Sequence, residues 1–141
     1  MRSAKGSPPV VVLDTNVVVS ALLKANSPPA RLLAAVLGGG LRIAFDARIL
    51  TEYRDVLLRP KFGFNPIHVE LLLEALERDG IAVAAPTWEL SLPDPDDRKF
   101  LEVASAVEPP ALVITGNIRH FPTELCGRVR VETPRDFLEQ S

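Results

Sequence analysis

The sequence contains very little cysteine and histidine, and these shortages exclude several kinds of protein. A single cysteine, Cys126, cannot form a disulfide within the chain, so we expect a protein of a reducing compartment, the cytoplasm. With only His68 and His120, the chain has no ligand set for a structural zinc site. It also has no basic excess, because 16 Lys and Arg residues oppose 18 Asp and Glu residues, for a formal net charge of −2. This balance argues against a protein that coats nucleic acid through a broad basic face, but an enzyme with local contacts remains compatible.

Long hydrophobic runs are missing too. The longest, residues 10–13 and 17–23, are separated by Asp14 and Asn16 and are far shorter than the ~20 residues that cross a bilayer. We therefore expect no membrane association. The first nine residues are mostly polar and lack the apolar segment of a signal peptide. We expect residues 1–9 to form a flexible lead-in and residues 10–141 to form a single domain.

The chain instead alternates short apolar runs with amphipathic segments. The runs that favour strands are residues 10–13, 41–45, 81–85, 111–115 and, as an edge strand, 129–131. Helices are predicted over residues 18–23, 31–37, 66–79 and 100–107, and from residues 47 and 134 onward. Thr15 or Asn16 is expected to cap the first helix, and Gly80 to follow the fourth in the C′ position. This alternation predicts an α/β protein, with a central parallel sheet of four to five short strands between two layers of helices.

Two polar residues lie just beyond predicted strands. Asp14 stands directly after the first strand, and Asn117 follows the fourth through Thr115 and Gly116. Parallel sheets bind ligands beyond the carboxyl ends of their strands, so Asp14 and Asn117 would face one crevice if these strands are neighbours. A role as a helix N-cap explains Asp14 equally well.

Further acids come from two helical regions. Glu52 lies in a mostly apolar helix, where pairing with Arg48 is the simpler explanation. Asp94, Asp96 and Asp97 precede a helix whose N-terminus they could cap. Gathered together, these carboxylates would repel one another unless a cation neutralised them, and oxygen ligands suit Mg²⁺ or Mn²⁺. Such an ion favours phosphodiester hydrolysis, because it polarises a phosphoryl oxygen and lowers the pKa of an attacking water.

Several short motifs follow one another along the chain. They are VVLDTNVVVSA at residues 11–21, PPARLL at 28–33, ILTEYRDVL at 49–57, RPKF at 59–62, DPDDRKFLE at 94–102, ITGN at 114–117 and HF at 120–121. In this order and at these spacings they resemble the PIN domain family, particularly the toxins of toxin–antitoxin pairs. No single motif is specific, but together they span nearly the whole chain after its first nine residues.

The resemblance implies a PIN-like fold and a metal-dependent endoribonuclease. It makes Asp14, Glu52 and Asp97 the catalytic carboxylates that bind Mg²⁺ or Mn²⁺. Asp97 is preferred over the two earlier aspartates of its segment because it stands directly ahead of the next helix face. The family's usual fourth acid is replaced by Asn117. Its amide oxygen can still ligate a cation but brings no charge.

Supporting residues and partners follow from the same resemblance. Asn16 and Thr115 would orient Asp14 or a bound water. The implied partners are an RNA substrate, an antitoxin protein and a second copy of the chain in a homodimer. Phe62 and Phe64 either stack on bases or pack inside the protein. The basic residues that could position phosphates, each with a plain surface role as the alternative, are Arg59, Lys61, Arg98, Lys99 and Arg119.

Three other hypotheses fit parts of the sequence. Asn117 favours a catalytically impaired PIN-like module that binds RNA or protein. A phosphatase with Asp14 as its nucleophile would need a second acid two residues later, where this chain has Asn16. A partner-binding domain whose acids are only helix caps would require the shared order of motifs to be a coincidence.

Overall fold

The structure, a computed structural model, describes residues 8–89 and 91–140. Its five strands are β1 (Val10–Leu13), β2 (Arg42–Phe45), β3 (Ile81–Ala82), β4 (Leu112–Ile114) and β5 (Val131–Glu132). Neighbouring strands pair in parallel, in the order β3-β2-β1-β4-β5. The predicted α/β class with a parallel sheet is confirmed. The predicted lead-in falls mostly on residues 1–7, which lie outside the described residues, and the division at residue 10 stays a prediction.

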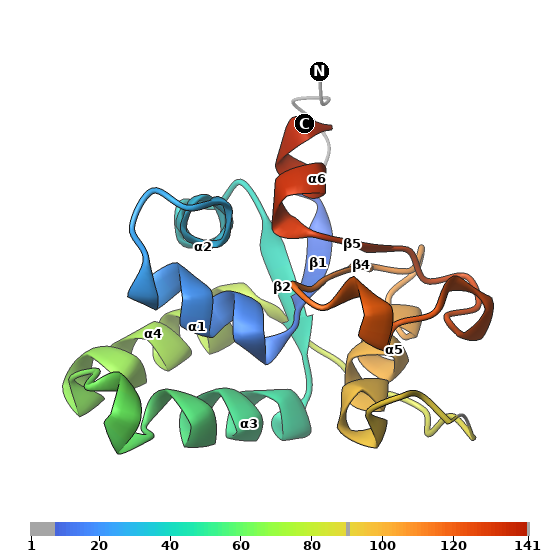
Figure 1. The fold of residues 1–141 in the computed structure, drawn as a ribbon, viewed down its shortest axis with the longest axis horizontal. Coiled ribbons are helices and arrows are strands. Elements are labelled where there is room, and N and C mark those ends of the chain that lie inside the picture. The colour runs from blue at the N-terminus through green and yellow to red at the C-terminus, as the bar shows by residue number, and fades with distance from the viewer. Residues whose placement is uncertain (1–7, 90, 141) are drawn as a thin grey trace.

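The central strand is β1, and its sequence explains that position. Val11, Val12 and Leu13 are each no more than 1% exposed, so the strand needs cover on both faces. Helices α1 (Thr15–Leu23) and α2 (Pro28–Leu37) pack together on one side of the sheet, as Figure 1 shows. Helix α5 (Arg98–Ser105) lies on the other side and contacts β1, β2 and β4. The predicted three layers are therefore confirmed.

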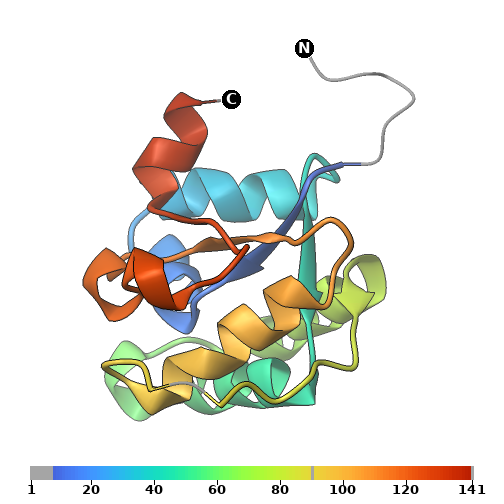
Figure 2. The same cartoon turned by 90° about the vertical axis from the view of Figure 1, so that its right-hand side faces the viewer.

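The remaining helices complete this cover. Helices α3 (Ala47–Leu57) and α4 (Pro66–Asp79) pack on each other and both contact β2, while α6 (Pro134–Glu139) contacts α2 (Figure 2). The connections contain the single-turn 3₁₀ helices η1 (Pro60–Phe62), η2 (Pro95–Asp97), η3 (Ile118–His120) and η4 (Thr123–Leu125). Across residues 8–89 and 91–140, no helix combines the length and apolar character that crossing a bilayer requires.

Two details of the helix ends differ from expectation. Asp14 caps α1, rather than Thr15 or Asn16, because its carboxylate accepts the backbone N–H of Asn16. Gly80 ends α4 with extended backbone instead of a left-handed turn. A Cβ on Gly80 would lie 2.6 Å from the carbonyl oxygen of Leu76 and 2.8 Å from that of Ile43. The crowding of Gly80 by the last turn of α4 and by β2, rather than a left-handed turn, therefore requires glycine there.

Candidate active site

The site lies where the chain changes direction across the sheet. From β1 the chain adds β2 and β3 on one side, and later β4 and β5 on the other. The carboxyl ends of β1 and β4 therefore flank a topological switch point, where α/β proteins bind ligands. Asp14 directly follows β1, and its backbone N–H donates to the carbonyl of Ile114 at 2.9 Å. Thr115 follows β4, so the sheet holds Asp14 and Thr115 side by side.

Asp14 is almost fully buried, with 4% of the residue exposed. Its Oδ2 accepts a hydrogen bond from the hydroxyl of Thr115 at 2.7 Å, and its Oδ1 accepts one from the backbone N–H of Asn16 at 3.4 Å. Burial raises the pKa of Asp14 above its usual value, although these two hydrogen bonds oppose the rise. The negative charge of Glu52 raises the pKa further. Asp14 is thus held in place as one of several neighbouring acids.

Helix α3 brings Glu52 to the same edge of the sheet. The hydroxyl of Tyr53, which is fully buried, donates to the carbonyl of Leu13 at 2.6 Å and ties the helix to the end of β1. Oε1 of Glu52 is 2.6 Å from Nζ of Lys99, and its Oε2 accepts a hydrogen bond from the hydroxyl of Thr15. Glu52 is therefore fixed by one donor from α1 and one from α5.

The expected pairing of Arg48 with Glu52 is wrong. Arg48 instead reaches Oδ2 of Asp46 at 2.7 Å and Oε1 of Glu102 at 2.6 Å. Glu102 is completely buried, and it accepts a further hydrogen bond from the backbone N–H of Trp88 at 2.8 Å. Arg98 also pairs with Glu102, at 3.2 Å. A buried carboxylate attracts cations more strongly than a partly exposed one, which explains why Arg48 selects Glu102.

Asp97 lies at the junction of η2 and α5, on the side of the sheet that carries α5. It is 8% exposed, and its Oδ2 is 3.1 Å from Nδ1 of His120. Burial raises the pKa of Asp97 to about 6, the charges of Asp14 and Asp94 add to the rise, and His120 opposes it. One ligand atom from each of Asp94, Asp97 and His120 lies within 4.8 Å of the others. Negative charge from three chain segments, around Asp14, Glu52 and Asp97, thus meets at one end of the sheet.

The two asparagines that were predicted near Asp14 take peripheral positions. Asn16 is exposed, and its recorded contact with Asp14 comes from its backbone N–H. Asn117 is exposed as well, and its backbone N–H donates to the hydroxyl of Thr115 at 3.0 Å. That hydroxyl therefore accepts from Asn117 while it donates to Asp14. Asn117 stabilises the orientation of Thr115 through its main chain, and its amide side chain is at the surface.

The predicted phosphate contacts fall into different environments. A groove of about 330 Å³ beside Glu52 is lined in part by Arg48, Arg59 and Lys99. Arg119 lines another depression, of about 430 Å³, together with Asn117 and His120. Both of these openings adjoin acids or amides of the site. The groove beside Glu52 also contains Glu52, Asp55 and Asp96, so its basic and acidic residues balance. Arg119 adds a positive charge at the other opening.

The aromatic pair near Lys61 faces the protein interior. The rings of Phe62 and Phe64 are stacked, with centroids 5.6 Å apart. Both side chains are partly buried against the main hydrophobic core, and the ammonium of Lys61 lies 5.1 Å from the centre of the Phe62 ring. This geometry agrees with packing inside the protein rather than with base stacking.

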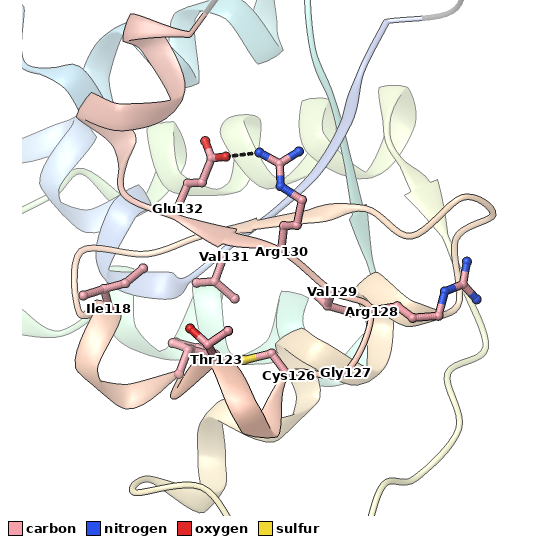
Figure 3. Close-up of a pocket in the computed structure, with 10 residues that line it drawn as sticks. Ile118, Thr123, Cys126, Gly127, Arg128, Val129, Arg130, Val131 and Glu132 are labelled. Atoms are coloured by element: carbon pink, nitrogen blue, oxygen red, sulfur yellow. Dashed lines mark hydrogen bonds and ion pairs between the residues drawn. The ribbon is translucent and has the colours of Figure 1, made fainter.

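A separate pocket of about 280 Å³ opens beside β5 and contains none of the predicted acids (Figure 3). Val131 points toward Thr123 and Cys126, whereas Arg130 and Glu132 point to the opposite side of the strand and form an ion pair. The thiol of Cys126 is buried and donates to the carbonyl of Pro122 at 3.3 Å. This arrangement makes Cys126 a packing residue.

Three side chains of the site were not predicted in their roles. Thr15 was expected as a helix cap and Lys99 as a phosphate contact, while His120 was assigned no role beyond its place in the HF motif. The contacts of Thr15 and Lys99 with Glu52, and of His120 with Asp97, all join residues far apart in sequence. Only the short distance of Thr15 from Asp14 along the chain could have indicated one of them.

The donors of this site suit a divalent cation of the hard type. They are carboxylate oxygens, with hydroxyl groups and one imidazole nearby, and no thiolate among the described residues approaches them. Burial and mutual repulsion raise the pKa of both Asp14 and Asp97. A bound cation would reverse that repulsion, because its positive charge stabilises the ionised carboxylates. The residues present therefore fit the ion that the sequence predicts.

Known proteins resemble this chain in sequence and in fold. An uncharacterized protein of Methanocaldococcus jannaschii is 29% identical over an alignment that covers 92% of this chain and 90% of that protein. A chain in the crystal structure of VapBC2 from Rickettsia felis, bound to a DNA fragment from their promoter, matches with a TM-score of 0.60 and 17% identity. That match covers 88% of this chain and 98% of the other, and it supports the fold.

The family assignment comes from the sequence itself. The model of the PIN domain matches residues 10–119, which is most of the chain and includes the strands and helices that carry Asp14, Glu52 and Asp97. The same stretch contains Thr115 and Asn117, so the predicted site lies entirely within the matched region. This protein therefore belongs to the PIN domain family.

Proposed function

We propose that this chain is a metal-dependent endoribonuclease that hydrolyses RNA phosphodiester bonds. One observation carries the proposal: Asp14, Glu52 and Asp97 come from separate segments to the switch point of the sheet, in a member of the PIN domain family. Members of this family are generally nucleases. Buried carboxylates that repel one another are costly for the fold, and their convergence is best explained by a cation and a reaction that uses it.

Asp14 and Asp97 would hold Mg²⁺ or Mn²⁺ directly, with Glu52 and the amide of Asn117 as further ligands. When bound, the ion would polarise a phosphoryl oxygen and lower the pKa of a water molecule. Thr115 orients Asp14 by donating to its Oδ2. An ionised carboxylate has about four lone-pair sites, so the hydrogen bonds from Thr115 and from the backbone of Asn16 leave others for an ion. Neutral donors thus fix the orientation of Asp14 without neutralising its negative charge.

The RNA would lie along the groove beside Glu52. Arg59 and Lys99 line this groove and would contact backbone phosphates, which positions a strand without reading its sequence. Lys99 already balances the charge of Glu52, so a phosphate that approaches Glu52 meets less repulsion. Arg119 lies beside His120 and would contact the strand on the other side of the acids. Arg98 and Lys61 remain further candidates for such contacts.

The proposal is tested by RNA cleavage. Single-stranded labelled RNA should be cut by the purified chain in Mg²⁺ or Mn²⁺ and left intact after chelation. Asp14→Asn should slow cleavage at least about a hundredfold, a barrier change of about 2.7 kcal/mol. Asp136→Asn, which changes an exposed aspartate of α6, is the matched control and should cut like the parent. Equal rates for Asp14→Asn and the parent would overturn the proposal.

We also propose a biological role as the toxin of a toxin–antitoxin pair, acting in the cytoplasm as a homodimer with an antitoxin protein as its partner. The support is the likeness of the fold to VapBC2 of Rickettsia felis, together with the family motifs. Induced expression of the parent in a bacterial host should arrest growth, and Asp14→Asn should not. Analytical ultracentrifugation should find twice the 15.4 kDa of one chain. Normal growth with the expressed parent would contradict the toxin role.

A second candidate function is a module that binds RNA without cutting it. The exposed amide of Asn117, where an acid is usual, favours this alternative. Gel shifts measured beside the cleavage assay separate the two functions. RNA that is retarded by the parent protein, but stays intact in Mg²⁺ and in Mn²⁺, would identify the binding module.

A further inference from the structure

A second group of metal ligands lies at the border of the acidic site. Asp94 precedes η2, Asp97 ends it, and His120 ends η3. One ligand atom from each residue lies within 4.8 Å of the other two, and Nδ1 of His120 is 3.1 Å from Oδ2 of Asp97. Ligands about 2.0–2.2 Å from a common ion are themselves on the order of 3–4 Å apart. A small movement of these side chains would therefore complete a chelate.

The position is both anchored and accessible. Asp97 is buried, so its carboxylate is fixed, whereas Asp94 is half-buried. The side chain of His120 is 42% exposed, and with Asn117 and Arg119 it lines the depression of about 430 Å³. An ion can thus enter from the solvent side and meet one fixed ligand and two that can adjust.

A simple ion pair does not account for the whole group. A protonated His120 would compensate a single carboxylate, while Asp97 is subject to the negative charges of both Asp94 and Asp14. A divalent cation would balance two carboxylates at once. It would also use the imidazole nitrogen as a neutral ligand, which is how histidine binds metals.

The type of donor indicates the type of ion. Mg²⁺ takes oxygen ligands and water, whereas an imidazole nitrogen suits first-row transition ions. We propose that Asp94, Asp97 and His120 form a cation position that prefers a first-row transition ion such as Mn²⁺ to Mg²⁺. The position shares Asp97 with the site of the proposed nuclease, and only its use in the reaction rests on that function. His120 would supply an imidazole nitrogen there, which binds such an ion more strongly than the amide oxygen of Asn117 would.

Pulsed electron paramagnetic resonance of bound Mn²⁺ tests the nitrogen ligand directly. The full chain, without a histidine tag and stripped of metal, is loaded with less than one equivalent of Mn²⁺. We expect modulation from an imidazole nitrogen in the parent and its loss in His120→Gln. His68→Gln removes the other imidazole of the chain, from an exposed position on α4, and should keep the modulation.

Calorimetry of the same proteins tests the preference between ions. His120→Gln should weaken Mn²⁺ binding at least about tenfold and change Mg²⁺ binding by less than about twofold. Asp94→Asn provides a second variant, which should weaken Mn²⁺ binding while the nitrogen modulation persists at saturating Mn²⁺. Circular dichroism confirms that each variant is folded before it is titrated.

The results distinguish this inference from the proposed function. Nitrogen modulation that is absent from the parent, or that survives in His120→Gln, overturns the inference even if Asp14-dependent RNA cleavage is found. Modulation that depends on His120 supports the inference even if the parent cuts no RNA. In that case the chain is a metal-binding protein with a different reaction or none.

Discussion

At the scale of single residues, Asp97 links the electrostatics of the site to pH. Its pKa in the folded protein, about 6, lies above the usual value of 3.8. Between these two values the folded protein holds a proton that the unfolded chain releases. Stability contributed by this group is therefore present below pH 3.8 and is lost as pH rises through about 6. The pKa of Asp14 is raised as well and acts in the same direction.

We accordingly expect the metal-free protein to lose stability between pH 4 and about 6 and to reach a plateau above that range. Denaturation by urea, measured in chelator at several pH values, gives this profile. Asp97→Asn should flatten this stability profile, with the residual slope due to Asp14.

Because a cation competes with the proton for the carboxylate of Asp97, Mg²⁺ affinity should rise over the same pH range. An affinity that does not change with pH would show that Asp97 is not a ligand.

The sequence predicts some residues of the site better than others. Asp14 and Asn117 follow two buried apolar runs, so the topology of a parallel sheet predicts that the ends of these strands lie together. The role of Thr115 was implied only by the resemblance. Glu52 and Asp97 were located by resemblance, because a carboxylate on or before a helix is usually a surface or capping residue. Thr15 and Lys99 are the donors that hold Glu52, and their positions depend on how α1 and α5 pack. No local pattern encodes that packing.

At the scale of elements, capping residues in the sequence predict where helices begin, but no comparable signal predicts how long the strands are. Prolines and capping side chains mark the starts of α2, α4 and α6. The starts of α4 and α6 agree with the predicted residues 66 and 134, whereas α2 begins at Pro28 instead of residue 31. The third strand was expected over residues 81–85 but spans only Ile81–Ala82. Its partner β2 ends at Phe45, to whose carbonyl Val83 still donates at 2.9 Å, so the residues after Val83 have no β2 residue opposite them. Apolar composition alone does not reveal where pairing ends.

The end of α4 gives a prediction at this scale. Gly80→Ala would place a Cβ 2.6 Å from the carbonyl oxygen of Leu76 in α4 and 2.8 Å from that of Ile43 in β2, so both the end of α4 and its packing on β2 would have to shift. We expect a loss of about 1–3 kcal/mol in the free energy of unfolding, as for other overpacked sites. Gly40→Ala is the control, because its nearest contact, at 3.6 Å, is an ordinary one. Equal thermal denaturation of the two variants would contradict the close approach of α4.

At the scale of the whole molecule, the proposed site couples metal binding to global stability. Its acids come from residues 14, 52 and 97 and meet only in the folded chain, so an ion that binds them stabilises the native state. At a Mn²⁺ concentration about 100 times the dissociation constant, the gain should be about 2.7 kcal/mol. Thermal unfolding measured against Mn²⁺ concentration tests this value. The double variant Asp14→Asn, Asp97→Asn should show no gain, and a gain equal to that of the parent would place the ion elsewhere.

The donors that pair with the acids of the site affect how the protein folds and how it responds to the supply of metal. Glu52 has the ammonium of Lys99, Asp97 has the imidazole of His120, and Asp14 has the hydroxyl of Thr115. Each acid thus has a hydrogen-bond or ion-pair partner within the chain, so we expect a newly made chain to reach its native shape before it encounters any ion. Withdrawal of metal should leave an intact, idle protein that recovers its competence when metal returns. Ion supply, rather than refolding, would then set how quickly it responds.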